Sequence, residues 1–212
     1  MRITNMISIA ALAAATAISG SASAATLASA TTALNIRSGP GPQYSVIGAI
    51  NQNSQVHMLG CIQDSLWCQV DDHGKRGWAY SKYLTTQTAG RPMVIAGNTA
   101  QIGVPSVTYQ APAGTAVETV GSAAPAITGT LVENPDGTTT QYVVNPPPTV
   151  RTYVVQHPAR QVYLNGEVVV GAGLPPDVAL QPVPDSDYQY AYVNSQPVLV
   201  QPQTRRIVYV YR

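Results

Sequence analysis

Short stretches in which apolar and polar residues alternate fill two parts of the chain. In the first part they lie at residues 34–37, 56–61 and 66–70. In the second part they lie at residues 151–155, 162–170, 188–193, 197–200 and 207–211. Alternation with a period of two sends successive side chains to opposite faces of a sheet, so these stretches predict strands. The chain is therefore expected to be all-β.

The second part, residues 150–212, predicts a β-meander rich in Tyr and Val. An Asn-Gly pair inside residues 162–170 is the strongest short signal for a hairpin. Strands at 188–193 and 197–200 are expected to pair with each other, and residues 207–211 are expected to close the meander.

Residues 87–149 separate the two β-rich parts and differ from them in composition. They contain eight Pro and eleven Thr, end in a run of Pro residues and have few large apolar side chains. Such a segment buries too little apolar surface to offset the entropy lost on ordering. We therefore expect a mostly extended or disordered linker between a first domain at residues 31–86 and a C-terminal domain at residues 150–212.

The overall charge excludes some classes of binding protein. The 212-residue chain has 11 Lys and Arg against 10 Asp and Glu, and charged residues make up 10% of it. In soluble domains the charged share is usually about 25%. Binding to nucleic acid or to an anionic membrane surface depends on an excess of positive charge. The composition therefore excludes a general nucleic-acid binder and a polybasic membrane-surface protein.

The N-terminus has the features of a secretory signal peptide. Arg2 supplies a positive charge, residues 6–18 are uncharged and rich in Ala, Ile and Leu, and Ala-Ser-Ala at residues 22–24 fits a cleavage site. The alternative, an uncleaved membrane anchor, would need about 20 apolar residues to span a bilayer. We expect residues 1–24 to be removed, leaving a periplasmic or secreted chain without an integral membrane segment.

Two cysteines, Cys61 and Cys68, lie in the part of the chain that is expected to be exported. Residues 56–61 and 66–70 resemble neighbouring strands joined by a turn, so a disulfide would connect the two strands of one hairpin. A zinc site is a weaker interpretation, because no third or fourth ligand accompanies the pair. The spacing is also not the Cys-x-x-Cys of a redox motif. A Cys61–Cys68 disulfide is the expected state.

The run Ala-Leu-Asn-Ile-Arg-Ser-Gly-Pro-Gly-Pro at residues 33–42 is the most specific motif of the first domain. Together with Gly-Trp-Ala-Tyr-Ser-Lys-Tyr-Leu at residues 77–84, it resembles the opening and closing motifs of bacterial SH3-like domains. The resemblance implies a small SH3-like barrel over residues 31–86, with further strands at residues 46–50 and 77–80. One departure is visible, because Asn-Ser at residues 53–54 stands where family members usually have Gly.

Bacterial SH3-like domains are commonly cell-wall targeting modules that bind peptidoglycan. The resemblance implies a ligand groove lined by Asn35, Arg37, Tyr44, Trp78 and Tyr80. Aromatic faces would pack on sugar or peptide carbons, while the Asn and Arg side chains would donate directional hydrogen bonds. For Trp78 the alternative is a place in the barrel core, and Tyr44 is the best candidate for a surface position.

Residues 150–212 resemble an uncharacterised family of C-terminal domains in exported alphaproteobacterial proteins. The likeness lies in a Val-Gly-x-x-Leu-Pro turn followed by Val-Pro, Tyr-x-Tyr, Val-Leu-Val and Thr-Arg-Arg-Ile-Val. This resemblance implies no activity.

Candidate catalytic and metal-binding residues are scarce. His57, His73 and His157 stand alone, at no metal-ligand spacing to another His, Cys or paired carboxylate. The sequence has no Gly-x-Ser-x-Gly and no His-Glu-x-x-His motif. It therefore predicts no catalytic residue, no metal and no cofactor. We expect a non-enzymatic protein that binds peptidoglycan or an envelope protein; the alternative is a periplasmic protein–protein adaptor with no wall binding.

Overall fold

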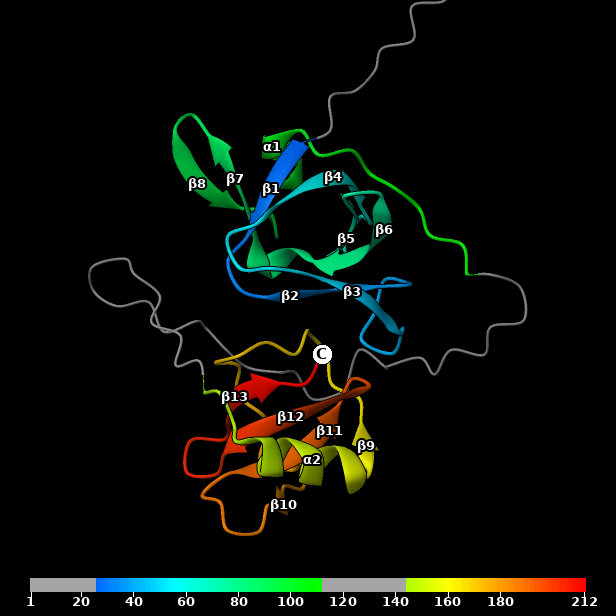
Figure 1. Cartoon of the computed structure of the whole chain (residues 1–212). Coiled ribbons are helices and arrows are strands. Elements are labelled where there is room, and N and C mark those ends of the chain that lie inside the picture. Colours follow the sequence, from blue (N-terminus) through cyan, green and yellow to red (C-terminus); the bar gives the residue numbers. More distant parts are fainter. Residues whose placement is uncertain (1–25, 112–143) are drawn as a thin grey trace, which may run out of the picture.

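Two β-sheets dominate the computed structural model, which describes residues 26–111 and 144–212 (Figure 1). An eight-stranded sheet belongs to the N-terminal domain, defined here as residues 26–111, and a five-stranded sheet belongs to the C-terminal domain, residues 144–212. The prediction of an all-β protein is confirmed. Within the two described ranges, no helix is long and apolar enough to cross a membrane.

The N-terminal sheet curls into an SH3-like barrel that is not closed (Figure 1). Its strands follow the order β3-β2-β6-β5-β4-β1-β7-β8. The strands predicted from the first part of the sequence are confirmed within two residues at each end. The elements are β1 (Thr26–Ala30), β2 (Leu34–Arg37), β3 (Val46–Ile50), β4 (Gln55–Cys61), β5 (Trp67–Asp72), β6 (Lys75–Tyr80), the 3₁₀ turn η1 (Ser81–Tyr83), β7 (Leu84–Thr88), β8 (Arg91–Val94) and α1 (Thr99–Ile102).

Two parts of this domain extend beyond the predicted barrel. β1 lies between β4 and β7, and both β8 and α1 belong to the expected linker. Ile95 and Val104 are buried in the barrel core. Residues 87–111 are therefore part of the N-terminal domain in this structure. Of the linker expected at residues 87–149, residues 112–143 lie outside the described residues, and its last two residues lie in a helix.

The departure from the family pattern at residues 53–54 leaves a regular tight turn. Asn53 has a left-handed backbone with φ 62°, a conformation that Gly adopts freely and that Asn tolerates better than most residues. Its backbone N–H donates to the Ala30 carbonyl at 2.7 Å. The turn before β4 is thereby tied to the end of β1.

The barrel core forms on the inner face of the curled sheet. Leu34 and Ile36 of β2 are fully buried, and so are Val56 and Val70. Trp78 is 3% exposed and belongs to this core, as its alternative assignment predicts. The apolar core continues into the C-terminal domain. The two domains therefore share a packed interface.

Cys61 and Cys68 form the predicted disulfide. The two residues face each other where β4 and β5 are paired, and their Cα atoms are 3.9 Å apart. Both side chains are buried. The bond closes the short connection between the two strands and so restricts the unfolded chain.

Replacing both cysteines by Ala is expected to lower the free energy of unfolding by about 2 to 3 kcal/mol. The expected loss is modest because the loop closed by the bond is short, and a short loop restricts the unfolded chain less than a long one. Urea unfolding of the oxidised mature protein and of the double variant measures this difference. Reduced wild-type protein is the control, since it loses the bond and keeps both side chains. An unchanged urea midpoint would contradict the prediction.

The C-terminal domain is a β-meander with a helix beside its sheet (Figure 1). β11 pairs with β12 and β12 pairs with β13, all antiparallel, which confirms the predicted meander. The elements are α2 (Pro148–Gln156), β9 (Gln161–Val162), β10 (Gln181–Pro182), β11 (Gln189–Val193), β12 (Gln196–Gln201) and β13 (Arg206–Val210).

The strand predicted at residues 151–155 is wrong, because these residues lie in helix α2. Pro148 suits the first turn of a helix, where its fixed φ is favourable and no N–H is needed. Val150 and Val154 lie about one turn apart and are buried against the sheet. The Tyr192 hydroxyl donates to the Val154 carbonyl at 2.9 Å, which fixes the helix on the sheet.

The hairpin predicted at residues 162–170 is also wrong. The strand that begins this region, β9, pairs in parallel with β11. The side chain of Asn194 binds the backbone that follows: its Oδ1 accepts from the Leu164 N–H at 2.8 Å, and its Nδ2 donates to the Leu164 and Gly166 carbonyls at 3.1 Å each. These side-chain bonds of Asn194 take the place of the backbone hydrogen bonds that a hairpin would form. The result is an irregular segment, called here the Glu167 loop (residues 163–168).

Candidate functional site

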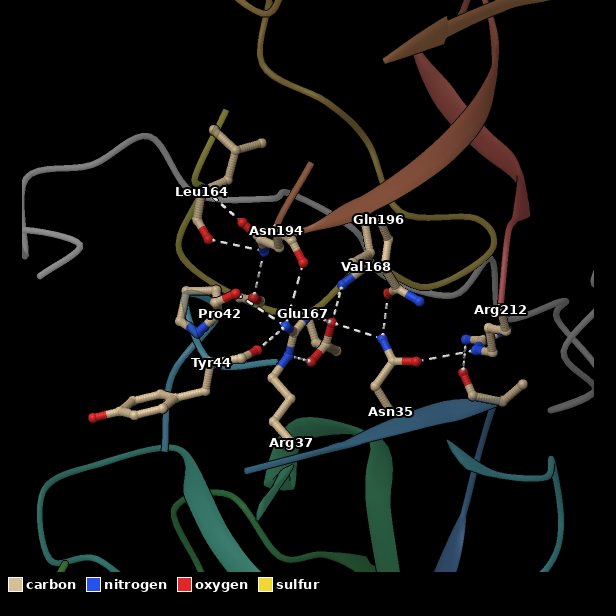
Figure 2. Close-up of polar contacts among 12 residues, drawn as sticks. Asn35, Arg37, Pro42, Tyr44, Leu164, Glu167, Val168, Asn194, Gln196 and Arg212 are labelled. Carbon is tan, nitrogen blue, oxygen red and sulfur yellow. Dashed lines mark hydrogen bonds and ion pairs between the residues drawn. The ribbon is translucent and has the colours of Figure 1, made fainter. Parts of the chain in front are cut away.

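The polar residues of β2 point toward the C-terminal domain (Figure 2). Leu34 and Ile36 belong to the barrel core, and because side chains alternate along a strand, Asn35 and Arg37 turn to the opposite face. All four residues are fully buried. β2 thus places an amide and a guanidinium inside the interface between the domains.

The Arg37 guanidinium closes the loop between β2 and β3. Its Nη1 donates to the carbonyls of Pro42 and Tyr44 at 3.0 and 2.8 Å. Gly39 permits this tight loop, because a Cβ there would lie 2.3 Å from the Tyr44 ring. The Gly- and Pro-rich motif therefore shapes a loop whose carbonyl groups hold one side of the guanidinium.

The other side of the guanidinium forms an ion pair with Glu167. Arg37 Nε donates to Oε2 at 2.5 Å and Nη2 donates to Oε1 at 2.6 Å, a bidentate arrangement. Neither side chain is exposed. The Val168 N–H also donates to Oε1, at 2.8 Å. A buried carboxylate is tolerated here because its charge is matched and both oxygens accept hydrogen bonds.

Asn35 joins the same polar network (Figure 2). Its Nδ2 donates to Glu167 Oε1 at 3.0 Å and to Gln196 Oε1 at 2.7 Å. Its Oδ1 accepts from Arg212 Nε at 3.1 Å. Burial lowers the pKa of Arg212, and the charge of Glu167 opposes this shift. Residues of the C-terminal domain therefore engage both polar atoms of the Asn35 side chain.

An aromatic cluster forms around Tyr109. The Tyr109 ring meets the rings of Tyr44 and Trp78 edge to face, with centroid distances of 5.6 and 5.5 Å. Burial and a side-chain hydrogen bond with Tyr109 raise the pKa of the Tyr44 hydroxyl. Tyr44 and Tyr109 remain partly exposed, so this cluster reaches the surface.

The segment that carries Tyr109 is held by β4. The Cys61 N–H donates to the Pro105 carbonyl at 2.9 Å, and the Val107 N–H donates to the Cys61 carbonyl at 3.0 Å. Val107 packs over Gly60, where a Cβ would lie 2.4 Å from its side chain. We call residues 104–109 the strap, since their contacts with β4 place Tyr109 on the barrel.

Two cavities adjoin the strap. One, of about 460 Å³, is lined by Pro40, Ile62, Gln63 and residues 106–109. The other, of about 560 Å³, shares Ile62, Gln63 and Ser106 with it and extends to the turn between β4 and β5 and to α1. Cavities of roughly 300 to 1,000 Å³ accommodate small ligands in proteins. The strap surface therefore has room for part of a ligand.

Tyr80, the remaining predicted ligand residue, lies in the barrel core. Its ring contacts the rings of Trp67 and Tyr83, with centroid distances of 5.3 and 6.0 Å. Burial raises the pKa of the Tyr80 hydroxyl, and the charge of Glu167 adds to this effect. The predicted ligand residues are thus divided among the domain interface, the strap and the core, and do not line one open groove in the described part of the chain.

Sequence reasoning missed the partners of these residues, namely Glu167, Gln196, Arg212 and Tyr109. Glu167 lies 130 residues after Arg37, and no local pattern connects the two. The available signal was an acidic residue directly before three consecutive Val residues. A carboxylate in an apolar run is rarely buried without a partner.

Each of the two domains matches a known protein family. Residues 32–85 match the family described as Bacterial SH3 domain, and residues 153–212 match the family described as Domain of unknown function (DUF1236). The chain carries a bacterial SH3 domain and a DUF1236 domain. The resemblances that the sequence shows in both regions are thereby confirmed. From here on, the N-terminal domain is called the SH3 domain and the C-terminal domain the DUF1236 domain.

The SH3 domain is also similar to part of a longer protein. A protein of Bacillus subtilis (strain 168), named "Putative N-acetylmuramoyl-L-alanine amidase YrvJ", is 40% identical over 68 residues. The match spans 32% of this chain and 13% of that protein. It covers the SH3 region and leaves the DUF1236 domain unmatched.

Proposed function

We propose that this protein is a non-enzymatic exported envelope protein whose SH3 domain binds peptidoglycan or cell-wall peptides. The observation that supports this most is the SH3 domain itself, which is 40% identical over 68 residues to part of a protein named as an N-acetylmuramoyl-L-alanine amidase. Residues 1–24 have the pattern of a signal peptide. The Cys61–Cys68 disulfide is typical of proteins outside the cytoplasm.

The surface around the strap is the favoured site for such a ligand. Tyr109 lines the cavity of about 460 Å³, and the partly exposed Tyr44 contacts the Tyr109 ring. Gln63 and Thr108 line the same cavity with exposed amide and hydroxyl groups. A mixture of aromatic faces and uncharged polar groups suits a polar polymer.

A binding role is favoured over a catalytic one by the extent of the similarity. The match to the amidase is confined to the SH3 region and covers 13% of that protein. SH3 domains bind ligands and do not supply the catalytic machinery of the enzymes that carry them. We therefore propose that the chain attaches to the wall and does not hydrolyse it.

A periplasmic protein–protein adaptor without wall binding is the second candidate function. It is favoured by the buried hydrogen bonds that Asn35 and Arg37 form with the DUF1236 domain. This face of the SH3 domain already recognises a protein surface. An adaptor would use the remaining surfaces of the domain pair to bind a second protein.

Sedimentation with isolated sacculi tests the proposed function. The oxidised mature protein, residues 25–212, is expected to pellet with sacculi, and a Tyr44→Ala variant is expected to bind roughly five- to tenfold more weakly, because an aromatic contact is lost. Tyr188→Ala is the matched control, since Tyr188 is a partly exposed tyrosine of the DUF1236 domain.

Two results would exclude parts of this proposal. If the wild-type protein stays in the supernatant, wall binding is excluded and the adaptor function takes its place. If the protein pellets and Tyr44→Ala binds as well as Tyr188→Ala, wall binding stands and the strap surface is excluded as its site.

A further inference from the structure

We infer that Asn35 and Arg37 form a carboxylate-recognition site of the SH3 domain, and that Glu167 of the DUF1236 domain occupies this site as an internal ligand. The external ligand of the site is a peptide with an acidic residue, which competes with Glu167. The part of this inference that concerns cell-wall peptides rests on the proposed function. The recognition of the carboxylate does not depend on it.

The Arg37 guanidinium is oriented mainly by its own domain. Nη1 donates to the carbonyls of Pro42 and Tyr44 at 3.0 and 2.8 Å, both in the loop between β2 and β3, and at a longer 3.3 Å to the Asn194 carbonyl of the DUF1236 domain. The Nε–H and Nη2–H then face the interface as a planar pair, the geometry that matches the two oxygens of a carboxylate (Figure 2). Donors that are already oriented lose little entropy when a ligand binds.

The carboxylate of Glu167 accepts hydrogen bonds from both residues of this site. Oε2 accepts from Arg37 Nε, and Oε1 accepts from Arg37 Nη2 and from Asn35 Nδ2. These three donors belong to the SH3 domain. Among the described residues, the fourth donor is the N–H of Val168, the residue directly after Glu167. An acidic residue within a peptide brings such an N–H with it. Gln196 and Arg212 of the DUF1236 domain contact the site through Asn35 and leave the Glu167 carboxylate untouched.

The Glu167 loop presents its carboxylate as a bound peptide would. It lies outside the β-meander, and Asn194 holds its backbone through Leu164 and Gly166. Gly166 has a φ of 106°, which turns the chain just before Glu167. The loop therefore projects one acidic side chain from the DUF1236 domain onto β2 (Figure 2).

Competition for the same atoms gives the DUF1236 domain a regulatory role. Both Asn35 and Arg37 are fully buried while Glu167 is in place. A peptide carboxylate reaches them only when the Glu167 loop withdraws. Docking of the DUF1236 domain therefore closes this site. Removal of the Glu167 carboxylate deletes the contacts that keep the Glu167 loop on Arg37, so the loop can withdraw and a peptide carboxylate can take its place.

Titration of two short peptides tests the inference. The probes are acetyl-Gly-Glu-Val-amide, which copies residues 166–168, and acetyl-Gly-Gln-Val-amide, which has the same shape without the charge. The full mature chain with Glu167→Ala is expected to bind the Glu peptide roughly tenfold or more tightly than the Gln peptide. The wild-type chain and an Asp177→Ala variant, which loses an exposed carboxylate of the same domain, are expected to bind neither.

Further variants keep the test decisive. Adding Arg37→Lys to Glu167→Ala is expected to remove the preference for the Glu peptide, because Lys keeps the charge and lacks the planar fork. If Glu167→Ala does not fold, Glu167→Gln takes its place, since it keeps the volume of the side chain and removes the charge. A folded variant that binds the two peptides equally, or binds neither, overturns the inference.

Sacculus sedimentation separates this inference from the proposed function. Glu167→Ala is expected to pellet several-fold more than the wild-type chain. If no variant pellets and the Glu peptide still binds Glu167→Ala, the proposed function fails and the carboxylate site stands. If the wild-type chain pellets in a Tyr44-dependent manner and Glu167→Ala shows no preference for the Glu peptide, the carboxylate site is overturned and the proposed function stands.

Discussion

An Arg37→Ala variant is expected to unfold with a free energy about 3 to 5 kcal/mol below that of the wild-type protein. The substitution leaves the Glu167 carboxylate buried without its counter-charge. It also removes the donors to the Pro42 and Tyr44 carbonyls, so the loop between β2 and β3 loses the hydrogen bonds that hold it to β2. Urea unfolding followed by tryptophan fluorescence measures the loss, because Trp78 pairs with Arg37 across β2 and β6.

Two further variants establish that the loss comes from the ion pair. Arg91→Ala removes an exposed arginine of β8 and is expected to change the free energy of unfolding by less than about 0.5 kcal/mol. The double variant Arg37→Ala, Glu167→Ala is expected to lose less than the sum of the two single variants, because the side chains interact directly. Strict additivity, or a loss below about 1 kcal/mol for Arg37→Ala, would show that the ion pair with Glu167 does not account for the loss in unfolding free energy.

An Asn194→Ala variant is expected to lose about 3 kcal/mol of unfolding free energy, because one buried side chain satisfies several buried backbone groups. Its amide binds the Leu164 N–H, the Leu164 carbonyl and the Gly166 carbonyl. Ala would leave these three groups without their Asn194 partner. Ala also tolerates the left-handed backbone at this position, with φ 51°, less well than Asn does. Urea unfolding gives the total loss, and amide hydrogen exchange at Leu164 reports the release of the Glu167 loop.

Ser195→Ala is the matched control for Asn194→Ala. Ser195 is the next residue, has a φ of 66° and is exposed. Its substitution therefore places Ala in the same backbone region without removing a buried hydrogen bond. Equal losses for the two variants would mean that backbone conformation, and not the Asn194 amide, holds the Glu167 loop.

Several strands were predictable from local sequence alone. β4 begins with alternating polar and apolar residues whose burial alternates in the same way, and its bounds agree with the sequence pattern within one residue. β11, β12 and β13 of the DUF1236 domain are rich in Val, Leu, Ile and Tyr, which favour strands. The disulfide was predictable for a related reason, because pairing of β4 with β5 brings the two cysteines together. Local periodicity carries this information without any knowledge of distant contacts.

Helix α2 and the Glu167 loop were not predictable from periodicity, because contacts from elsewhere decide their conformation. Residues 151–155 are rich in Val and Tyr, which favour strands, yet packing of Val150 and Val154 on the sheet makes them helical. The Asn-Gly signal in residues 162–170 is overridden by Asn194, which binds the same backbone. Tertiary interactions of this kind outweigh local preference.

The candidate site was predictable only in part. The resemblance carried by the motif at residues 33–42 implied Asn35 and Arg37 as ligand residues, and both take part in a dense network of hydrogen bonds. Their side-chain partners in the DUF1236 domain lie between 130 and 177 residues further along the chain, so no spacing rule could find them. Tyr109 was missed because it lies in a segment whose composition suggests a linker.

β1 has a consequence for how the SH3 domain can be studied in isolation. The family match begins at residue 32, after this strand, although β1 joins β4 to β7 within the described sheet. A fragment cut at residues 32–85 would leave the backbone N–H and C=O groups of both neighbours unpaired, and such groups act as templates for pairing between molecules. The structural unit is therefore longer than the unit of sequence similarity, and a fragment that keeps the whole sheet needs to begin no later than residue 26.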